Sequence, residues 1–207
     1  MIGRDEVFDL FEHESAIWFF DYHGDPLAPH AELTSGLCSD GFINCRLVLC
    51  NPAWVALIAS RLVELAKMCD VGKPDWVVGS AYSAIVLSYE VARLMGAKHG
   101  FVQKSETDPK TMVWPNLSIT EGATVLQCEE LITTSGTRAK VRDAIDKGIA
   151  ASSPGRELGP AHRQSRLIRS ALITLARPTL RSGSFLFFGR RQIRNKKTRT
   201  FRIAGPA

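Results

Sequence analysis

The stretch from Val125 to Thr137 constrains the fold more than any other part of the chain. It begins as an apolar run of strand length, places the carboxylates Glu129 and Glu130 side by side, and ends in small hydroxyl residues before a helical pattern at 138–147. This order predicts a strand, a tight loop and the N-terminus of a helix. Several backbone N–H groups of such a loop point at one place, where the helix dipole adds positive potential.

The loop is suited to bind the phosphate of a ligand that also carries hydroxyl groups or a divalent cation. Its hydroxyls can donate hydrogen bonds, and its glycine has no Cβ to prevent a close backbone approach; the residues are Thr133, Thr134, Ser135, Gly136 and Thr137. Two neighbouring carboxylates would repel a simple anion, but they can hold the hydroxyls of a phosphorylated sugar or its divalent cation. The alternative is an ordinary strand–helix turn with good capping residues, which the acidic pair disfavours.

Charge divides the chain into two parts. Residues 1–150 contain 13 Lys and Arg against 20 Asp and Glu, a net charge of −7, whereas residues 151–207 contain 13 Lys and Arg against Glu157 alone, a net charge of +12. We therefore expect a core domain followed by a basic segment. Five cysteines without a Cys-x-x-Cys motif favour reduced thiols. Neither a signal peptide nor a membrane-spanning run is evident in the sequence. We therefore expect a cytoplasmic protein.

The rest of the core alternates helical and strand patterns. We expect one helix over 6–18, a second that begins after Asn51 as N-cap with Pro52 in its first turn, and a third over 85–95. We expect buried strands over 75–79 and 99–104. The loop Ser80, Ala81, Tyr82 and Ser83 follows the first of these strands, and Gly148 is expected to end the helix that follows the Val125–Thr137 stretch. The order predicts an α/β fold with a parallel sheet whose ligands lie at the C-terminal ends of the strands.

The Val125–Thr137 stretch resembles the 5-phosphoribosyl 1-diphosphate (PRPP) signature of type I phosphoribosyltransferases, which is a hydrophobic strand, two acidic residues and a Thr-Thr-Gly-x-Thr-like loop. The loop at 80–83 is similar to the family's pyrophosphate-binding loop. The turn with Ser35, Gly36 and Ser39, followed by Phe42 and Ile43, resembles the N-terminal segment of orotate phosphoribosyltransferases. The resemblance covers about residues 8–149. It implies a Rossmann-like parallel sheet of the type I phosphoribosyltransferase kind, which we expect to be incomplete at the C-terminus.

The resemblance implies an enzyme of pyrimidine nucleotide biosynthesis that transfers the ribose 5-phosphate of PRPP to orotate, giving orotidine 5′-phosphate and diphosphate. It further implies Mg²⁺ as cofactor and a homodimer, with no metal ligand assigned. Glu129 and Glu130 would hold the ribose hydroxyls, residues 133–137 the 5′-phosphate, and residues 80–83 the diphosphate together with Lys104. Lys110 is the basic candidate in a mobile lid over 105–118. The base would lie against Ser35, Gly36, Phe42 and Ile43.

Several positions depart from the family pattern. Thr34 stands where a lysine is common, Gln103 where an arginine often precedes Lys104, and Ser83-Ala84 where glycine is expected. Ala84 fits only if its φ is negative. Two alternatives therefore stay open, a PRPP-binding regulator without catalysis and a phosphoribosyltransferase for a purine base.

The basic segment at 151–207 contains two strand candidates, at 171–175 and 185–188, in a sequence otherwise rich in Arg, Ser and Pro. One interpretation is a nucleic-acid-binding arm, which would be the chain's only route to nucleic acid. The other is a segment that is out of the ancestral frame or disordered, which leaves the sheet incomplete. No membrane partner is expected.

Overall fold

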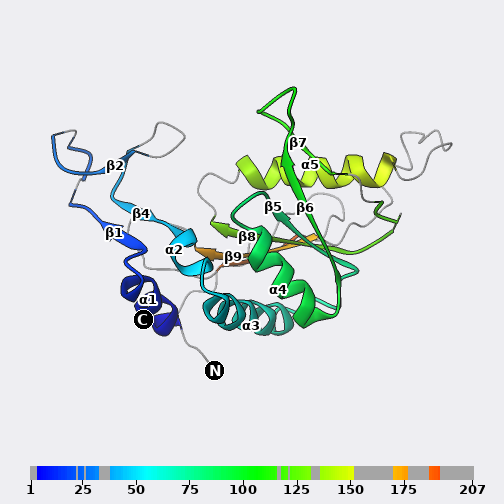
Figure 1. The fold of residues 1–207 in the computed structure, drawn as a ribbon, viewed down its shortest axis with the longest axis horizontal. Helices are drawn as coiled ribbons and strands as arrows, with labels where there is room; N and C mark the ends of the chain where they lie inside the picture. Colours follow the sequence, from blue (N-terminus) through cyan, green and yellow to red (C-terminus); the bar gives the residue numbers. More distant parts are fainter. Residues whose placement is uncertain are drawn as a thin grey trace.

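The computed structural model describes residues 4–21, 23–25, 27–32, 38–115, 118–120, 122–131, 136–151, 170–176 and 187–191. A six-stranded sheet lies at its centre, in the order β10-β9-β8-β5-β6-β7 (Figure 1). The strands are β5 (Trp76–Ser80), β6 (Lys98–Lys104), β7 (Met112–Val113), β8 (Val125–Leu131), β9 (Ser170–Ala176) and β10 (Phe187–Arg191). The four central strands are parallel, and β7 and β10 pair antiparallel at the two edges. The predicted α/β fold with a Rossmann-like parallel sheet is confirmed.

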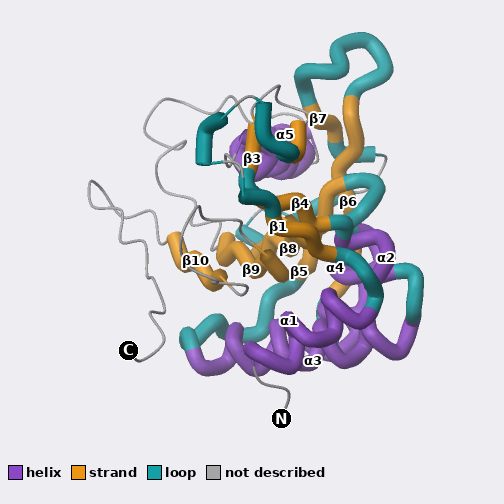
Figure 2. The backbone as a smooth tube through the Cα atoms, turned by 90° about the vertical axis from the view of Figure 1, so that its left-hand side faces the viewer, coloured by secondary structure: helices purple, strands orange, loops and turns teal. Residues whose placement is uncertain are grey.

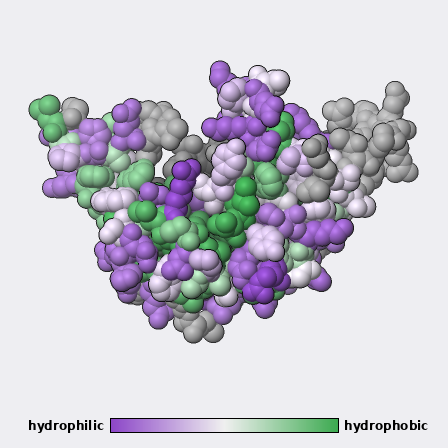
Figure 3. All heavy atoms as spheres, viewed as in Figure 1, coloured by the Kyte–Doolittle hydropathy of each residue, from purple (hydrophilic) through white to green (hydrophobic). Residues whose placement is uncertain are grey.

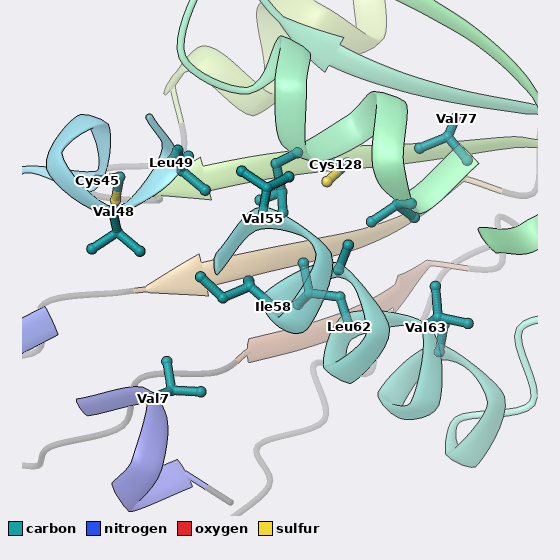
Figure 4. Packing of buried hydrophobic residues seen from close by; sticks show 14 of the residues in the cluster. Val7, Cys45, Val48, Leu49, Val55, Ile58, Leu62, Val63, Val77 and Cys128 are labelled. Carbon is teal, nitrogen blue, oxygen red and sulfur yellow. The ribbon is translucent and has the colours of Figure 1, made fainter. Parts of the chain in front are cut away.

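Helices cover both faces of this sheet. Helices α3 (Pro52–Met68) and α4 (Ile85–Met95) lie on one face and α5 (Gly136–Ala151) lies on the other, as Figure 2 shows for α3 and α5. The first face is the larger hydrophobic core, in which side chains of α3 meet Val77 and Cys128 of the sheet (Figure 4). The second face packs Val125 and Val78 against Val141 and Ile145 of α5. The alternation of side chains along each strand separates the two cores.

Local signals explain the bounds of α3 and α4. Asn51 caps α3 by accepting a hydrogen bond from the Ala53 N–H at 3.0 Å, and Pro52 occupies the first turn. Ile58 and Leu62, one helical turn apart on α3, are buried. Helix α4 has the predicted bounds and ends at Gly96, whose φ of +61° favours glycine.

The N-terminal part contains α1 (Arg4–His13), α2 (Cys45–Leu49) and the short strands β1 (Ile17–Phe19), β2 (Ala31–Glu32), β3 (Cys38–Ser39) and β4 (Gly41–Ile43). The prediction of one helix over 6–18 is wrong beyond His13. The backbone turns at Ser15, whose φ is +50°, and β1 then pairs antiparallel with β4. Trp18 consequently packs its ring against Phe42, with centroids 5.5 Å apart, instead of continuing a helical stripe.

The C-terminal segment supplies the strand that the sequence-based prediction left out. Strand β9 pairs parallel with β8 from Leu126 to Leu131, and β10 pairs antiparallel with β9. The expectation of a sheet incomplete beside β8 is therefore wrong. The apolar candidate at 171–175 lies in β9 and satisfies the hydrogen-bonding edge that β8 would otherwise expose. The candidate at 185–188 lies only in part within the described residues, where β10 begins at Phe187.

Two further differences concern the segment between β6 and α5. The predicted lid at 105–118 is a β-hairpin over most of its length, with β7 paired to the end of β6 (Figure 1). Gly148 does not end its helix, because α5 continues to Ala151. Its missing Cβ leaves room for the Trp114 ring, which a Cβ would approach to 2.9 Å. Among the described residues no helix combines the length and the hydropathy needed to cross a membrane.

Candidate functional site

The candidate site lies at the point in the sheet where the helical connections switch from one face to the other. From β5 the chain leaves through α4 on one face, and from β8 it leaves through α5 on the other, although β5 and β8 are neighbours. The helices diverge at this point, so the C-terminal ends of β5 and β8 border the place where ligands bind in open α/β sheets. Ser80 ends β5, and Glu129 and Glu130 lie near the end of β8.

Glu129 is locked into the sheet on the α5 side. Its side chain is only 2% exposed. The Ser80 hydroxyl donates to Glu129 Oε2 at 2.6 Å, and the Gln127 amide donates to Oε1 at 2.9 Å. Burial raises the pKa of Glu129 to about 7, against the opposing effect of these two hydrogen bonds. Both oxygens therefore have protein partners, and Glu129 joins the end of β8 to the start of the β5–α4 loop.

Glu130 lies on the other face of β8, because successive strand residues alternate. Burial raises its pKa; hydrogen bonds from its backbone and from the Ser83 hydroxyl, and the charge of Arg46, oppose that shift. Its Oε2 atom is buried and has no hydrogen-bond partner among the described residues. An unpartnered buried carboxylate oxygen is costly, so the desolvation of this atom is not compensated within the described part of the chain.

The pKa of Glu129 gives the first testable prediction. A carboxyl with a pKa of about 7 in the folded chain and an ordinary value of 4.5 takes up a proton on folding between these pH values. Its contribution to stability is therefore most favourable below about pH 4.5 and is lost as pH rises to about 7. Glu129→Gln removes this loss, which is on the order of 1–3 kcal/mol. We expect Tm to fall less steeply between pH 5 and 7 in the variant than in the wild-type chain. The difference between the two falls in Tm should be roughly 3–8 °C over this pH range.

Calorimetry at several pH values measures this slope. Glu106→Gln, at an exposed carboxylate in the β6–β7 hairpin, is the control and should keep the wild-type slope. An unchanged slope in Glu129→Gln would show that Glu129 is not a buried titrating group.

The β5–α4 loop is shaped by small residues. A Cβ on Gly79 would lie 2.8 Å from the Ala84 carbonyl oxygen, so glycine permits the close approach of α4 to β5. Ala84 has a φ of −83°, which meets the condition that an alanine needs at this position. The Ala81 N–H donates to the Val102 carbonyl at 2.7 Å, and the Ala81–Tyr82 peptide bond is cis. Tyr82 is 80% exposed at the loop's surface.

The two lysines lie at different places on the β6–β7 hairpin. Lys104 is the last residue of β6, two residues beyond Val102, which pairs with Ser80 of β5. Its side chain is exposed at the same end of the sheet as the carboxylates. Lys110 lies in the turn of the hairpin, where its N–H donates to Asp108 Oδ1 at 2.9 Å.

The predicted base-binding and phosphate-binding residues are described in part. Phe42 and Ile43 lie on β4, close to the end of β8, since the Cys45 thiol lies 3.8 Å from the Glu130 carbonyl oxygen. Gly136 and Thr137 begin α5, as a phosphate loop at a helix N-terminus requires. The remaining predicted residues lie outside the described part of the chain: Ser35, Gly36, Thr133, Thr134 and Ser135.

The sequence-based prediction missed Gln127 and Arg46. Gln127 could have been found, because a polar residue two positions before Glu129 in an apolar strand shares its face. Arg46 lies on α2 and was brought to Glu130 only by the packing of α2 against β8. No local pattern in the sequence reveals this contact.

Oxygen ligands and phosphate are what Mg²⁺ prefers, and proteins usually bind it through one or two carboxylates together with substrate phosphates. The described residues contain no group of three or more His, Cys, Asp or Glu side chains that could hold a metal ion by themselves. Glu130, near the end of β8, is an oxygen donor of the kind that Mg²⁺ binds together with substrate phosphates.

The chain is similar in sequence to orotate phosphoribosyltransferases of other organisms. The chain is 31% identical over 150 residues to the orotate phosphoribosyltransferase of Heliobacterium modesticaldum, covering 72% of this chain and 71% of that protein. It is 33% identical over 144 residues to the enzyme of the same name from Pelotomaculum thermopropionicum, covering 70% and 68%.

Solved structures agree in fold. Orotate phosphoribosyltransferase from Aeropyrum pernix matches with a TM-score of 0.51 and 17% identity over 69% of this chain and 74% of that chain. Leishmania donovani UMP synthase matches with a TM-score of 0.51 and 16% sequence identity, over 69% of this chain and 28% of that chain. No family model matches the chain.

Proposed function

The chain belongs to the orotate phosphoribosyltransferase family, and we propose that it transfers the ribose 5-phosphate of PRPP to orotate. The products are orotidine 5′-phosphate and diphosphate. The observation that carries the proposal in the structure is the pair of carboxylates near the end of β8: Glu129 accepts a hydrogen bond from Ser80 on one face, and on the other face Oε2 of Glu130 has no partner among the described residues. It lies between two strand ends whose loops have the family's phosphate-binding patterns.

In this proposal Glu129 and Glu130 have different roles. Glu130 accepts the ribose hydroxyls through Oε2, which has no hydrogen-bond partner in the described part of the chain. Ser83 and Arg46 act on the same carboxylate. Glu129 fixes Ser80 and so sets the position of the β5–α4 loop, which binds the diphosphate through its backbone N–H groups. Gly136 and Thr137 bind the 5′-phosphate at the N-terminus of α5.

The chemistry separates the sugar from its diphosphate as the base nitrogen approaches. Positive charge develops on the ribose ring and negative charge on the departing diphosphate. Lys104 stabilises the departing charge from the end of β6, and fixed charges are effective there because they need no reorganisation. When bound, Mg²⁺ neutralises part of the diphosphate charge. The β6–β7 hairpin limits the access of water to the reactive sugar.

A base panel tests the proposal against its alternatives. The purified full-length chain is supplied with PRPP and Mg²⁺, and diphosphate release is measured with orotate, adenine, guanine and hypoxanthine in turn. We expect release with orotate alone. Release with a purine would favour the purine alternative, whereas PRPP binding without release for any base would favour the regulator.

We also propose a homodimer formed through α4. Val86 and Tyr89 are 47% and 58% exposed on one face of this helix, next to Tyr82 of the diphosphate loop. Apolar side chains also gather near the middle of this side of the molecule in Figure 3. A second copy is the proposed occupant, because covering this helix would place the partner beside the β5–α4 loop and so next to the proposed diphosphate site.

Val86→Glu should convert the dimer to a monomer, because a carboxylate buried at an interface without a partner costs several kcal/mol. Light scattering after size-exclusion chromatography measures the mass. Ser60→Glu, on the exposed side of α3, is the matched control and should keep the wild-type mass. A wild-type chain that is monomeric at every concentration would reject the dimer, and an unchanged mass in Val86→Glu would reject this face.

We propose that residues 1–150 are a phosphoribosyltransferase core that needs β9 from the basic segment at 151–207. Deleting residues 152–207 removes β9 and leaves the β8 edge unpaired. We expect the truncated chain to aggregate, because an open edge is a pairing hazard. Sedimentation and calorimetry measure solubility and cooperative melting.

A soluble, cooperatively melting truncated chain would contradict the need for β9. In that case salt-sensitive binding of the full chain to RNA or DNA, lost on truncation, would establish the segment as a nucleic-acid arm.

A further inference from the structure

The Trp114 ring packs against two glycines that lie on different secondary-structure elements. Trp114 follows β7 directly, and its ring packs against Gly100 of β6 and Gly148 of α5. A Cβ on Gly100 would lie 3.0 Å from Cζ2 of the ring, and a Cβ on Gly148 would lie 2.9 Å from Cγ. The ring also meets Trp76 of β5 edge to face, with centroids 5.9 Å apart. Trp114 is therefore held by β5, β6 and α5 together.

The end of β6 depends on the hairpin that Trp114 closes. The last β5 residue to pair with β6 is Ser80, opposite Val102, so Lys104 extends beyond the support of β5. On its other side Lys104 pairs with Met112 of β7, and the Ser105 N–H donates to the Thr111 carbonyl at 3.1 Å. Strand β7 has only two residues, and a ladder this short is marginal without packing.

We propose that Trp114 is the positioning residue for Lys104: it anchors the root of the hairpin in the core and thereby holds the lysine at the diphosphate end of the site. Met112, partly buried in the same core, adds to the anchor. The free part of the hairpin is then confined to its turn, which carries Lys110. The inference rests on the proposed function for the role of Lys104, whereas the anchoring itself does not.

Trypsin tests the anchoring without any assay of activity, because it cleaves after Lys104 and Lys110. In Gly148→Ala the new methyl group displaces the Trp114 ring, while alanine raises helix propensity at that position. We expect cleavage after Lys104, followed by mass spectrometry, to be about tenfold faster than in the wild-type chain, whereas cleavage after Lys110, already in the free turn, should change less. Gly72→Ala is the matched control, since a Cβ there meets nothing within 4 Å, and should be cleaved at the wild-type rate.

Trp114→Phe is a second variant with the same expectation, because the smaller ring loses the contact with Gly100. Wild-type cleavage rates in both variants would overturn the anchoring. Faster cleavage at every tryptic site would also overturn it, since that would mean general destabilisation.

A double-mutant cycle tests whether Trp114 acts through Lys104. Trp114→Phe should lower kcat about tenfold in the wild-type background and less than about twofold in the Lys104→Met background. Equal factors in both backgrounds would reject the positioning role and leave the proposed function intact. Wild-type activity in Lys104→Met itself would reject both the catalytic role of Lys104 and the positioning role of Trp114. The trypsin cleavage rates would still test whether Trp114 anchors the hairpin.

Discussion

Replacing Glu130 with glutamine is expected to lower kcat/KM for PRPP by roughly 10²- to 10⁴-fold, with little change in Tm. Hydrogen bonds to a charged acceptor contribute about 1.5–3 kcal/mol each, and the Glu130 carboxylate is proposed to accept two ribose hydroxyls. The glutamine keeps the shape of the side chain but presents an NH₂ group to one hydroxyl. It also relieves the burial of a charge, so the fold should be maintained.

Glu129→Gln is the matched comparison, since it makes the same chemical change one residue away on the opposite face. Its amide can still bond to Ser80 and Gln127 after rotation, so we expect a loss of about tenfold or less. Steady-state kinetics at a fixed orotate concentration measure both variants. Equal losses in the two variants would mean that the free Oε2 of Glu130 does not mark the ribose site.

Lys104→Met is expected to lower kcat by roughly 10²- to 10³-fold, the usual loss when one group that stabilises developing charge is removed. Methionine keeps the length and apolar stem of the side chain, so the effect isolates the ammonium group. The KM for PRPP should change less than kcat, because the charge on the diphosphate grows as the bond breaks.

Lys110→Met, in the turn of the same hairpin, provides the comparison. Single-turnover kinetics separate bond cleavage from product release in each variant. If Lys104→Met raised KM and left kcat unchanged, Lys104 would bind the ground state and would not stabilise the transition state.

The sequence predicted the fold well where local signals and tertiary packing agree. Asn51 and Pro52 determine where α3 begins, and Gly96 determines where α4 ends. The order of strand, acidic pair, loop and helix at 125–137 correctly predicted β8 and the helix α5 that follows it. It also led to the family, which the comparisons with curated relatives support.

The separation of the two carboxylates was not predicted, because they were placed after the strand rather than inside it. Strand β8 continues to Leu131, and the alternation of its side chains sends Glu129 and Glu130 to opposite faces. The strand length depends on β9, which pairs with these residues from far along the chain. Local propensity carries no information about such a partner.

Trp114 was missed for a similar reason. Its neighbourhood shows no periodicity, and the two glycines that receive its ring lie on elements distant in sequence. The pattern predicted a C-cap at Gly148 because glycine ends helices more often than it accommodates a ring. A glycine inside a helix is a cost of about 1 kcal/mol, which the packing of Trp114 offsets.

The central claim is that this chain converts PRPP and orotate into orotidine 5′-phosphate at the site bounded by β5 and β8. The most direct measurement incubates the full-length chain with PRPP, orotate and Mg²⁺ and quantifies orotidine 5′-phosphate and diphosphate together. We predict equal amounts of the two products, formed over many turnovers and nearly abolished by Glu130→Gln. Saturable PRPP binding with no orotidine 5′-phosphate above the level of that variant would contradict the claim.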